Sequence, residues 1–160
     1  MENPLLELQE YENLQEALKK AKGPVQATGT LDSQKVHLMY WLGKDGGFPW
    51  KLVVTYDDQR AREIYDDFRS FTENVWLYPA KDLLFYSADI HGNLMTRQRI
   101  AVWRHLMEEE EGVVVTTLDG LMDHLLPLVF LKQQAVTVEN GQVMDLDEWK
   151  ERLTALGYER

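Results

Sequence analysis

The sequence contains no cysteine, so disulfide scaffolds, thiol nucleophiles and cysteine-based zinc sites are excluded. Positive charge is scarce: 17 Lys and Arg residues stand against 27 Asp and Glu residues, which gives a formal net charge of −10. This balance disfavours a protein whose whole surface binds nucleic acid or an anionic membrane, because both partners require a positively charged surface. A local basic patch stays compatible with it.

Long apolar runs are also absent. The most apolar stretch, residues 125–131, is too short to span a bilayer and contains Pro127. The N-terminus, Met1-Glu2-Asn3-Pro4, lacks the basic start and apolar core of a secretory signal. We therefore expect a cytoplasmic protein.

What remains is an ordinary globular composition. The 160 residues are 44% hydrophobic and 28% charged, which argues against intrinsic disorder and allows one domain, or one domain and a part of another. Apolar periodicity and turn residues predict helices over 5–21, 32–42, 58–71, 93–110, 118–126 and 146–156. They predict strands over 25–28, 51–56, 75–78, 113–117 and 134–139.

From residue 25 onward, strands and helices alternate, which predicts an α/β fold with a parallel sheet and helices on both of its faces. The strand at 51–56 alternates little, as expected for a strand that is buried on both faces. The last strand, turn and helix are more polar and acidic, so we place a boundary near Lys132. Residues 1–132 are then an α/β module, and residues 133–160 begin a small α+β module.

The first strand-to-helix turn is where a nucleotide loop is expected in such a fold. A P-loop needs glycines to wrap phosphate, a Lys to neutralise it and a Ser or Thr for Mg²⁺. With Gly29 as the middle glycine, Gln26 and Leu31 stand where the other glycines belong, and Asp32 stands in place of the Lys. Because an acid repels phosphate, we expect a degenerate P-loop without bound nucleotide, at Thr28, Gly29, Thr30, Asp32 and Ser33. An ordinary turn capped by Asp32 or Ser33 is the alternative.

No other motif predicts catalysis. The pair Asp57-Asp58 superficially resembles a metal-holding acid pair, but a helix follows at once and N-capping is the stronger interpretation. The four histidines lack metal-ligand spacing, and no GxSxG motif is present. We predict no catalytic residue, no metal site and no cofactor.

Arginine and tryptophan residues leave further alternatives open. Arg97 and Arg104 are seven residues apart on one predicted helix and could touch phosphate or a protein acid. A solvated helix face that pairs with Glu108 is favoured. Trp149 could be a core residue or an interface anchor. The other tryptophans are expected in the core: Trp41, Trp50, Trp76 and Trp103.

Several motifs together resemble one family. Their order and spacing are more specific than any single one of them: Leu77-Tyr78-Pro79, residues 97–106, residues 112–122, and Gly141-Gln142 through Gly157-Tyr158-Glu159-Arg160. In this order they resemble the N-terminal region of the bacterial transcription-repair coupling factors. That region is in turn similar to the damage-recognition protein UvrB.

The resemblance implies a RecA-derived, UvrB-like module over residues 1–132, with a P-loop that is degenerate as in other coupling factors. Residues 133–160 would begin the module that recruits UvrA, and the family chain continues past the GYER motif, so we expect the chain to stop inside that module. Tyr158 and Arg160 match the start of the recruiting surface. Arg160 is the strongest single candidate for a UvrA contact.

The family also implies an ATP-dependent DNA translocase, with motor domains and an RNA polymerase-binding segment outside these 160 residues. We therefore expect a non-catalytic scaffold that supports UvrA recruitment in transcription-coupled nucleotide excision repair. The alternatives are a small P-loop-like nucleotide-binding protein and a stand-alone protein-interaction domain.

Overall fold

The fold was analysed in a computed structural model, which describes residues 2–80 and 89–122. Further along, it describes residues 127, 129, 132–133, 140–141 and 145–155. The chain divides into two compact units, Met1–Asp123 and His124–Arg160. The module boundary near Lys132 stays a prediction.

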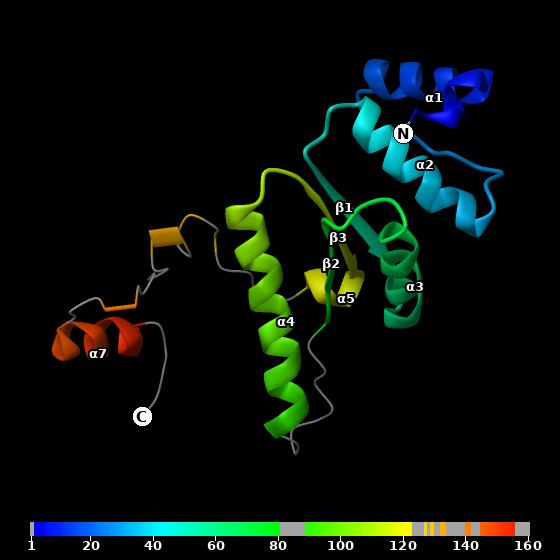
Figure 1. The fold of residues 1–160 in the computed structure, drawn as a ribbon. Coiled ribbons are helices and arrows are strands. Elements are labelled where there is room, and N and C mark those ends of the chain that lie inside the picture. Colours follow the sequence, from blue (N-terminus) through cyan, green and yellow to red (C-terminus); the bar gives the residue numbers. More distant parts are fainter. Residues whose placement is uncertain are drawn as a thin grey trace. The chain divides into compact units, whose positions relative to one another are not determined.

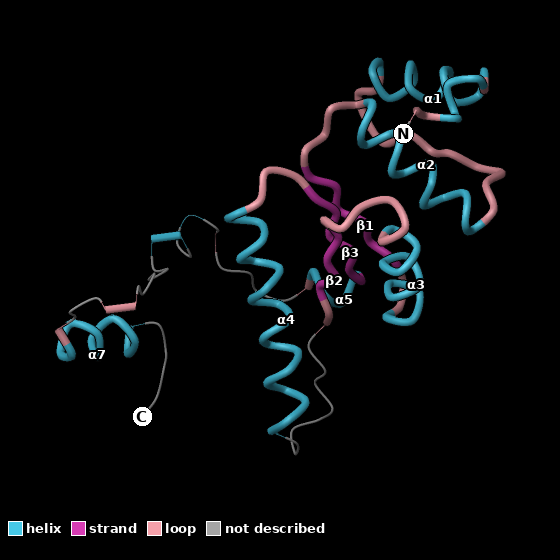
Figure 2. The backbone as a smooth tube through the Cα atoms, in the orientation of Figure 1, coloured by secondary structure: helices cyan, strands magenta, loops and turns pink. Residues whose placement is uncertain are grey.

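A parallel sheet forms the centre of the first unit (Figures 1 and 2). Its strands are β1 (Trp50–Thr55), β2 (Val75–Tyr78) and β3 (Gly112–Thr117). The spatial order is β1-β3-β2, and both pairings are parallel. Helices separate the strands along the chain, as parallel pairing requires. The predicted α/β class is confirmed.

One face of the sheet packs on α3 (Asp58–Phe68). The buried side of α3 consists of Ala61, Ile64 and Phe68, whose spacing of three and four residues puts them on one stripe. They meet alternate residues of the strands, including Val113 and Val115 of β3. Helix α2 (Asp32–Asp45) contacts α3 and adds a fully buried valine to the same core.

The opposite face packs on α4 (Asp89–Glu108), which Figure 1 shows across the sheet from α3. Here Val114 of β3 and Tyr78 of β2 meet Val102 of α4. Half-buried residues complete this core: Trp50, Trp76, Trp103 and Leu106. Three of the four tryptophans expected in the core thus lie at this face, and the fourth, Trp41, is 2% exposed in α2.

Two predictions about strands are wrong. Residues 25–28 form no strand and belong to an irregular segment between the first two α-helices, because none of the described strands pairs with them. The β1 strand is not buried on both faces, since Leu52 is 59% exposed and Val54 is 41% exposed. The reason is its place at the sheet edge: α4 packs on β2, at the other edge.

The N-terminal segment is tied to α2 by one carboxylate. The predicted helix over 5–21 is divided into a 3₁₀ turn, η1 (Pro4–Glu7), and α1 (Gln9–Lys20), with extended backbone between them. The side chain of Asp45 at the end of α2 accepts hydrogen bonds from Asn3 (2.6 Å), Tyr11 (2.7 Å) and Gln15 (3.3 Å). A single acid therefore fixes both short elements against α2.

Two shorter helices complete the described elements. Helix α5 (Leu118–Leu121) directly follows β3, and its N-cap hydroxyl on Thr117 accepts from the amide of Gly120 at 3.2 Å. In the second unit, α7 (Leu146–Ala155) has the predicted cap, since the Asp145 carboxylate accepts from the Asp147 amide at 2.8 Å. The predicted turn at 140–141 is present, and the strand predicted at 134–139 lies outside the described residues.

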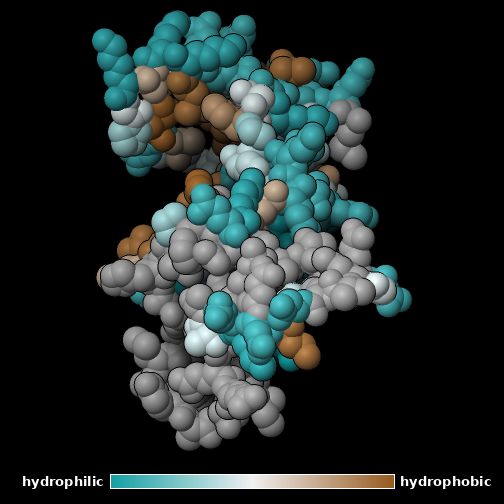
Figure 3. Space-filling model, turned by 90° about the vertical axis from the view of Figure 1, so that its left-hand side faces the viewer, coloured by the Kyte–Doolittle hydropathy of each residue, from teal (hydrophilic) through white to brown (hydrophobic). Residues whose placement is uncertain are grey.

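On the face drawn in Figure 3, hydrophobic residues gather in several separate groups among hydrophilic ones. Large apolar side chains exposed in the first unit include Leu31, Phe48, Tyr56 and Met122. No helix among the described residues is both long enough and apolar enough to cross a bilayer.

Candidate functional site

The predicted nucleotide loop lies between α1 and α2 and carries one conformationally special residue. Gly29 has a φ of +85°, in the left-handed region that side chains with a Cβ rarely adopt. A Cβ added there would meet nothing within 4 Å, so the glycine is required by the backbone and not by a close neighbour. The loop thus keeps one turn-forming glycine of the motif while lacking the strand that normally precedes it.

The helix after the loop starts at Asp32, but neither Asp32 nor Ser33 caps it. The N-cap residue is Leu31, which has extended backbone and no side-chain hydrogen bond to the helix. Its own amide donates to the Gln34 side chain at 3.1 Å. The predicted cap at Asp32 or Ser33 is therefore wrong. The Asp32 side chain is left available for contacts elsewhere.

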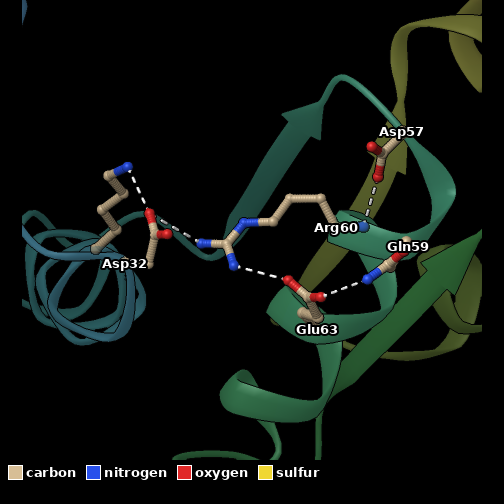
Figure 4. A network of polar contacts seen from close by, with 6 residues as sticks. Asp32, Asp57, Gln59, Arg60 and Glu63 are labelled. Atoms are coloured by element: carbon tan, nitrogen blue, oxygen red, sulfur yellow. Dashed lines mark hydrogen bonds and ion pairs between the residues drawn. The ribbon is translucent and has the colours of Figure 1, made fainter.

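Asp32 contacts two cations (Figure 4). Its Oδ1 lies 2.8 Å from the Lys35 ammonium, one turn further along α2, and 3.4 Å from Nη2 of Arg60 in α3. Arg60 in turn donates from Nη1 to Glu63 at 2.9 Å, and the Gln59 amide donates to the other oxygen of Glu63 at 3.2 Å. Figure 4 shows the network bridging two helices.

The backbone at the start of α3 holds Arg60 in this position. The Asp57 side chain accepts from the Arg60 amide at 2.6 Å, which confirms Asp57 as the helix cap. The acid pair at 57–58 thus has the capping role that the sequence favours, with Asp58 in the first turn. Acids at this end are stabilised by the helix dipole.

The network favours the charged forms of three of its members. The hydrogen bond from Lys35, followed by the charges of Arg60 and Lys35, holds the pKa of the Asp32 carboxyl below its ordinary value. The hydrogen bond from Arg60, followed by that from Gln59, lowers the pKa of Glu63. The hydrogen bond to Glu63 raises the pKa of Arg60. Each shift favours a charge that the group already carries at neutral pH, and solvent screens these interactions because Asp32 and Glu63 are exposed.

This arrangement is unsuited to a nucleotide phosphate. A phosphate at the start of α2 would meet the ionised carboxylate of Asp32, and the two nearest cations already contact acids. Thr28 and Thr30 do line a pocket of about 420 Å³, together with leucines of the N-terminal segment. Among the described residues that line it there is no lysine or arginine, so it offers no cation to a phosphate.

The structure describes some of the remaining candidate residues and not others. Tyr158 and Arg160 lie outside the described residues, and their partner-binding role stays a prediction. Arg104 pairs with Glu108, with 3.5 Å between Nε and Oε2, which confirms the expected solvated ion pair. Among the described residues, no three His, Asp or Glu side chains are grouped closely enough to hold a metal ion.

Sequence reasoning missed the part played by Lys35 and Arg60. The two ion pairs within helices could have been predicted, because the acid–base pairs 32/35 and 60/63 both have the i,i+3 spacing of helix neighbours.

Sequence reasoning also missed that Arg99 is buried. Arg99 is only two positions from Arg97 and so faces the other way on α4. It donates to the Pro79 carbonyl at 3.1 Å, and its guanidinium lies 4.4 Å from the centre of the Tyr78 ring.

Comparisons with known proteins point to the same family as the motifs. No family model matches the chain. Curated proteins do match over 111 residues, or 68% of the chain: the transcription-repair-coupling factors of Staphylococcus epidermidis at 25% identity, and of Staphylococcus haemolyticus and Staphylococcus aureus at 23%. The chain is similar to the transcription-repair-coupling factors. It spans about a tenth of the length of these relatives, since the match covers 10% of each.

The similarity confirms the resemblance that the motifs carry. It covers a region of the coupling factors and not their full length.

Proposed function

We propose that this chain is a non-catalytic scaffold from the N-terminal region of a transcription-repair coupling factor, and that it supports recruitment of UvrA in nucleotide excision repair. The single observation that supports the non-catalytic part most strongly is the Asp32 carboxylate at the start of α2, paired with Lys35 and Arg60. An acid fills the place of the phosphate lysine. In this proposal ATP hydrolysis, DNA translocation and RNA polymerase binding belong to other segments, and the protein works in the cytoplasm.

The nucleotide part is tested by calorimetric titration of the chain with ATP and Mg²⁺. We expect no binding heat and no ATPase activity. Micromolar binding that is lost in the Gly29→Trp variant would contradict the proposal and favour a nucleotide-binding protein with a non-standard loop. The matched control is Gly141→Trp. This glycine also has positive φ (+89°) and open space around it, so both variants carry comparable backbone strain at separate turns.

The recruitment part rests on the family similarity and on the match of Tyr158 and Arg160 to the family motif. It is tested by measuring UvrA binding to this chain and to a version that continues past Arg160. We expect the longer version to bind UvrA and Arg160→Glu to weaken binding about tenfold or more, as for a charged interface contact. Arg97→Glu, at an exposed position of α4, is the matched control.

A longer version that folds and ignores UvrA would contradict recruitment. A stand-alone interaction domain would then be the better interpretation. Equal weakening by the two arginine variants would show that only net charge matters.

A further inference from the structure

A second pocket, of about 300 Å³, lies at the amino ends of the strands. Its lining includes Lys51 at the start of β1, Asn74 just before β2, and Gly112 at the start of β3. Ligands of open parallel sheets usually bind at the opposite edge, where the strands end. The pocket also shares no lining residue with the loop at 28–33. It is therefore a separate place from the degenerate nucleotide loop.

The Lys51 side chain is positioned by a glycine in α2. The aliphatic stem of Lys51 crosses α2 at Gly43, where an added Cβ would come within 2.6 Å of Lys51 Cε. Gly43 lies inside the helix and has no positive φ, so backbone conformation does not require a glycine there. The absence of a side chain at Gly43 instead gives the lysine room to lie along the pocket wall.

A second lysine of the same pocket is held by aromatic rings. The Lys44 ammonium lies 5.1 Å from the ring centre of Trp41 and 5.8 Å from that of Tyr40. Such cation–π contacts leave the N–H donors of the ammonium free for another acceptor. Among the described residues, no carboxylate oxygen lies within 4.0 Å of Lys44 or Lys51. In a chain with a net charge of −10, two such lysines in one pocket reverse the local sign of charge.

Asn74, one acid and two aromatic rings also line the pocket. The amide N–H of Asn74 donates to the Thr72 hydroxyl at 3.1 Å, and its carbonyl accepts from the Val113 amide at 2.9 Å, so the backbone here is fixed. The side-chain amide of Asn74 forms no hydrogen bond with a described residue and can donate into the pocket. One acid, Glu111, also lines the pocket and lies exposed. The aromatic wall consists of Tyr40 and of Phe48, which is 57% exposed.

We propose that this pocket binds a small organic anion, a phosphate or carboxylate group attached to an aromatic ring. The anionic group contacts Lys44, Lys51 and the amide of Asn74, and charge-assisted hydrogen bonds of this kind are stronger than neutral ones. The ring packs on Phe48 and against the edge of Tyr40, whose ring stacks on Phe71. The volume is at the lower end of the range for small-molecule sites, which favours one ring and one charged group over a larger ligand.

The test is an amide NMR titration of the 160-residue protein with phenyl phosphate and with benzoate. As controls, inorganic phosphate supplies the negative charge without a ring, and benzyl alcohol supplies the ring without a charge. We expect saturable shifts at Gly47, Asn74 and Gly112, none at Gly29, and tighter binding of the compounds that carry both parts. Phenyl phosphate and benzoate distinguish the two anionic groups. No saturable shift at these amides at millimolar concentration with either compound would overturn the proposal.

A double variant tests the contribution of the two positive charges to binding. The double change Lys44→Gln and Lys51→Gln is expected to weaken binding about tenfold or more, because it removes two charge-assisted contacts. The matched control is Lys19→Gln with Lys22→Gln, two exposed lysines of equal charge outside this pocket. An equal loss in both double variants would show unspecific attraction and overturn the proposal.

A third variant moves one lysine without changing the charge. In Gly43→Ala the new methyl group takes the place of the Lys51 stem, while the helix keeps its fold because alanine is the better helix former. We expect binding several-fold weaker than in the unmodified protein. Unchanged affinity would contradict the position assigned to the anion.

Discussion

The contact between Tyr11 and Asp45 makes a strong prediction about stability. Tyr11 is 3% exposed, and its hydroxyl donates to the Asp45 carboxylate at 2.7 Å. Tyr11→Phe removes this bond and leaves the ring in place. Hydrogen bonds to charged groups contribute about 1.5–3 kcal/mol. Because Asp45 is exposed and keeps Asn3 and Gln15 as donors, we expect a loss of stability at or just below the lower end of this range, about 1–2 kcal/mol.

The same contact predicts a pH dependence. Burial, followed by the hydrogen bond to Asp45, raises the pKa of Tyr11 to about 12, against 10.0 for the free side chain. A raised pKa in the folded state means that the stabilisation is fully present below pH 10. It is lost as the pH rises toward 12, because the unfolded chain releases the proton first.

The assay is urea unfolding of the unmodified protein and of Tyr11→Phe, followed by tryptophan fluorescence from pH 7 to pH 11. Tyr56→Phe is the control, since Tyr56 is 78% exposed and removal of its hydroxyl should change stability little. We expect the difference between protein and variant to be constant up to about pH 10 and to shrink above it. A difference as small as that of Tyr56→Phe at pH 7, or one that grows above pH 10, would refute the reasoning.

Three further substitutions test the packing and capping of the first unit by the same unfolding assay. Asp57→Ala removes the cap of α3 and should cost about 0.5–2 kcal/mol, whereas no measurable change would mean that water replaces the carboxylate. Gly112→Ala places a methyl group against the rings of two tryptophans, and the overpacking should cost about 1–3 kcal/mol; a stabilised variant would contradict the close contact. Thr116→Val keeps the shape of a fully buried side chain but deprives the Tyr78 carbonyl of its 2.8 Å donor, with an expected cost of about 1–3 kcal/mol. A neutral effect at Thr116 would show that this carbonyl is satisfied elsewhere.

Local signals predicted most elements of the first unit. The β-branched run at 113–117 and the short apolar run at 75–78 both form strands, because each is bounded by turn residues and too short for a helix. Asp57 caps its helix as expected, since this cap depends only on residues next to it in the chain. The helix over 32–42 extends three residues further, to Asp45, because Gly43 stays inside it under the Lys51 side chain.

Most failures concern contacts between distant residues, whereas the cap wrongly expected at Asp32 or Ser33 is a local one. The run Val25–Thr28 has the composition of a strand, but a strand exists only where another one pairs with it, and none of the described strands does. The exposure of Leu52 follows in the same way from the place of β1 at the sheet edge. The linear sequence does not specify which strands are neighbours in the sheet or which strand lies at its edge.

By itself, the sequence determined the α/β class and the absence of cysteine chemistry, and it predicted that an acid, Asp32, stands where a P-loop carries its phosphate lysine. Only the tertiary structure decided what that acid does: Arg60, 28 positions later in the chain, reaches Asp32 across the contact between two helices. Lys44 and Lys51 likewise line one pocket, at the amino ends of the strands, only because the end of α2 packs beside the start of β1. Local propensity depends on neighbours in the chain, whereas the charge of a site depends on which helices and strands the core brings together.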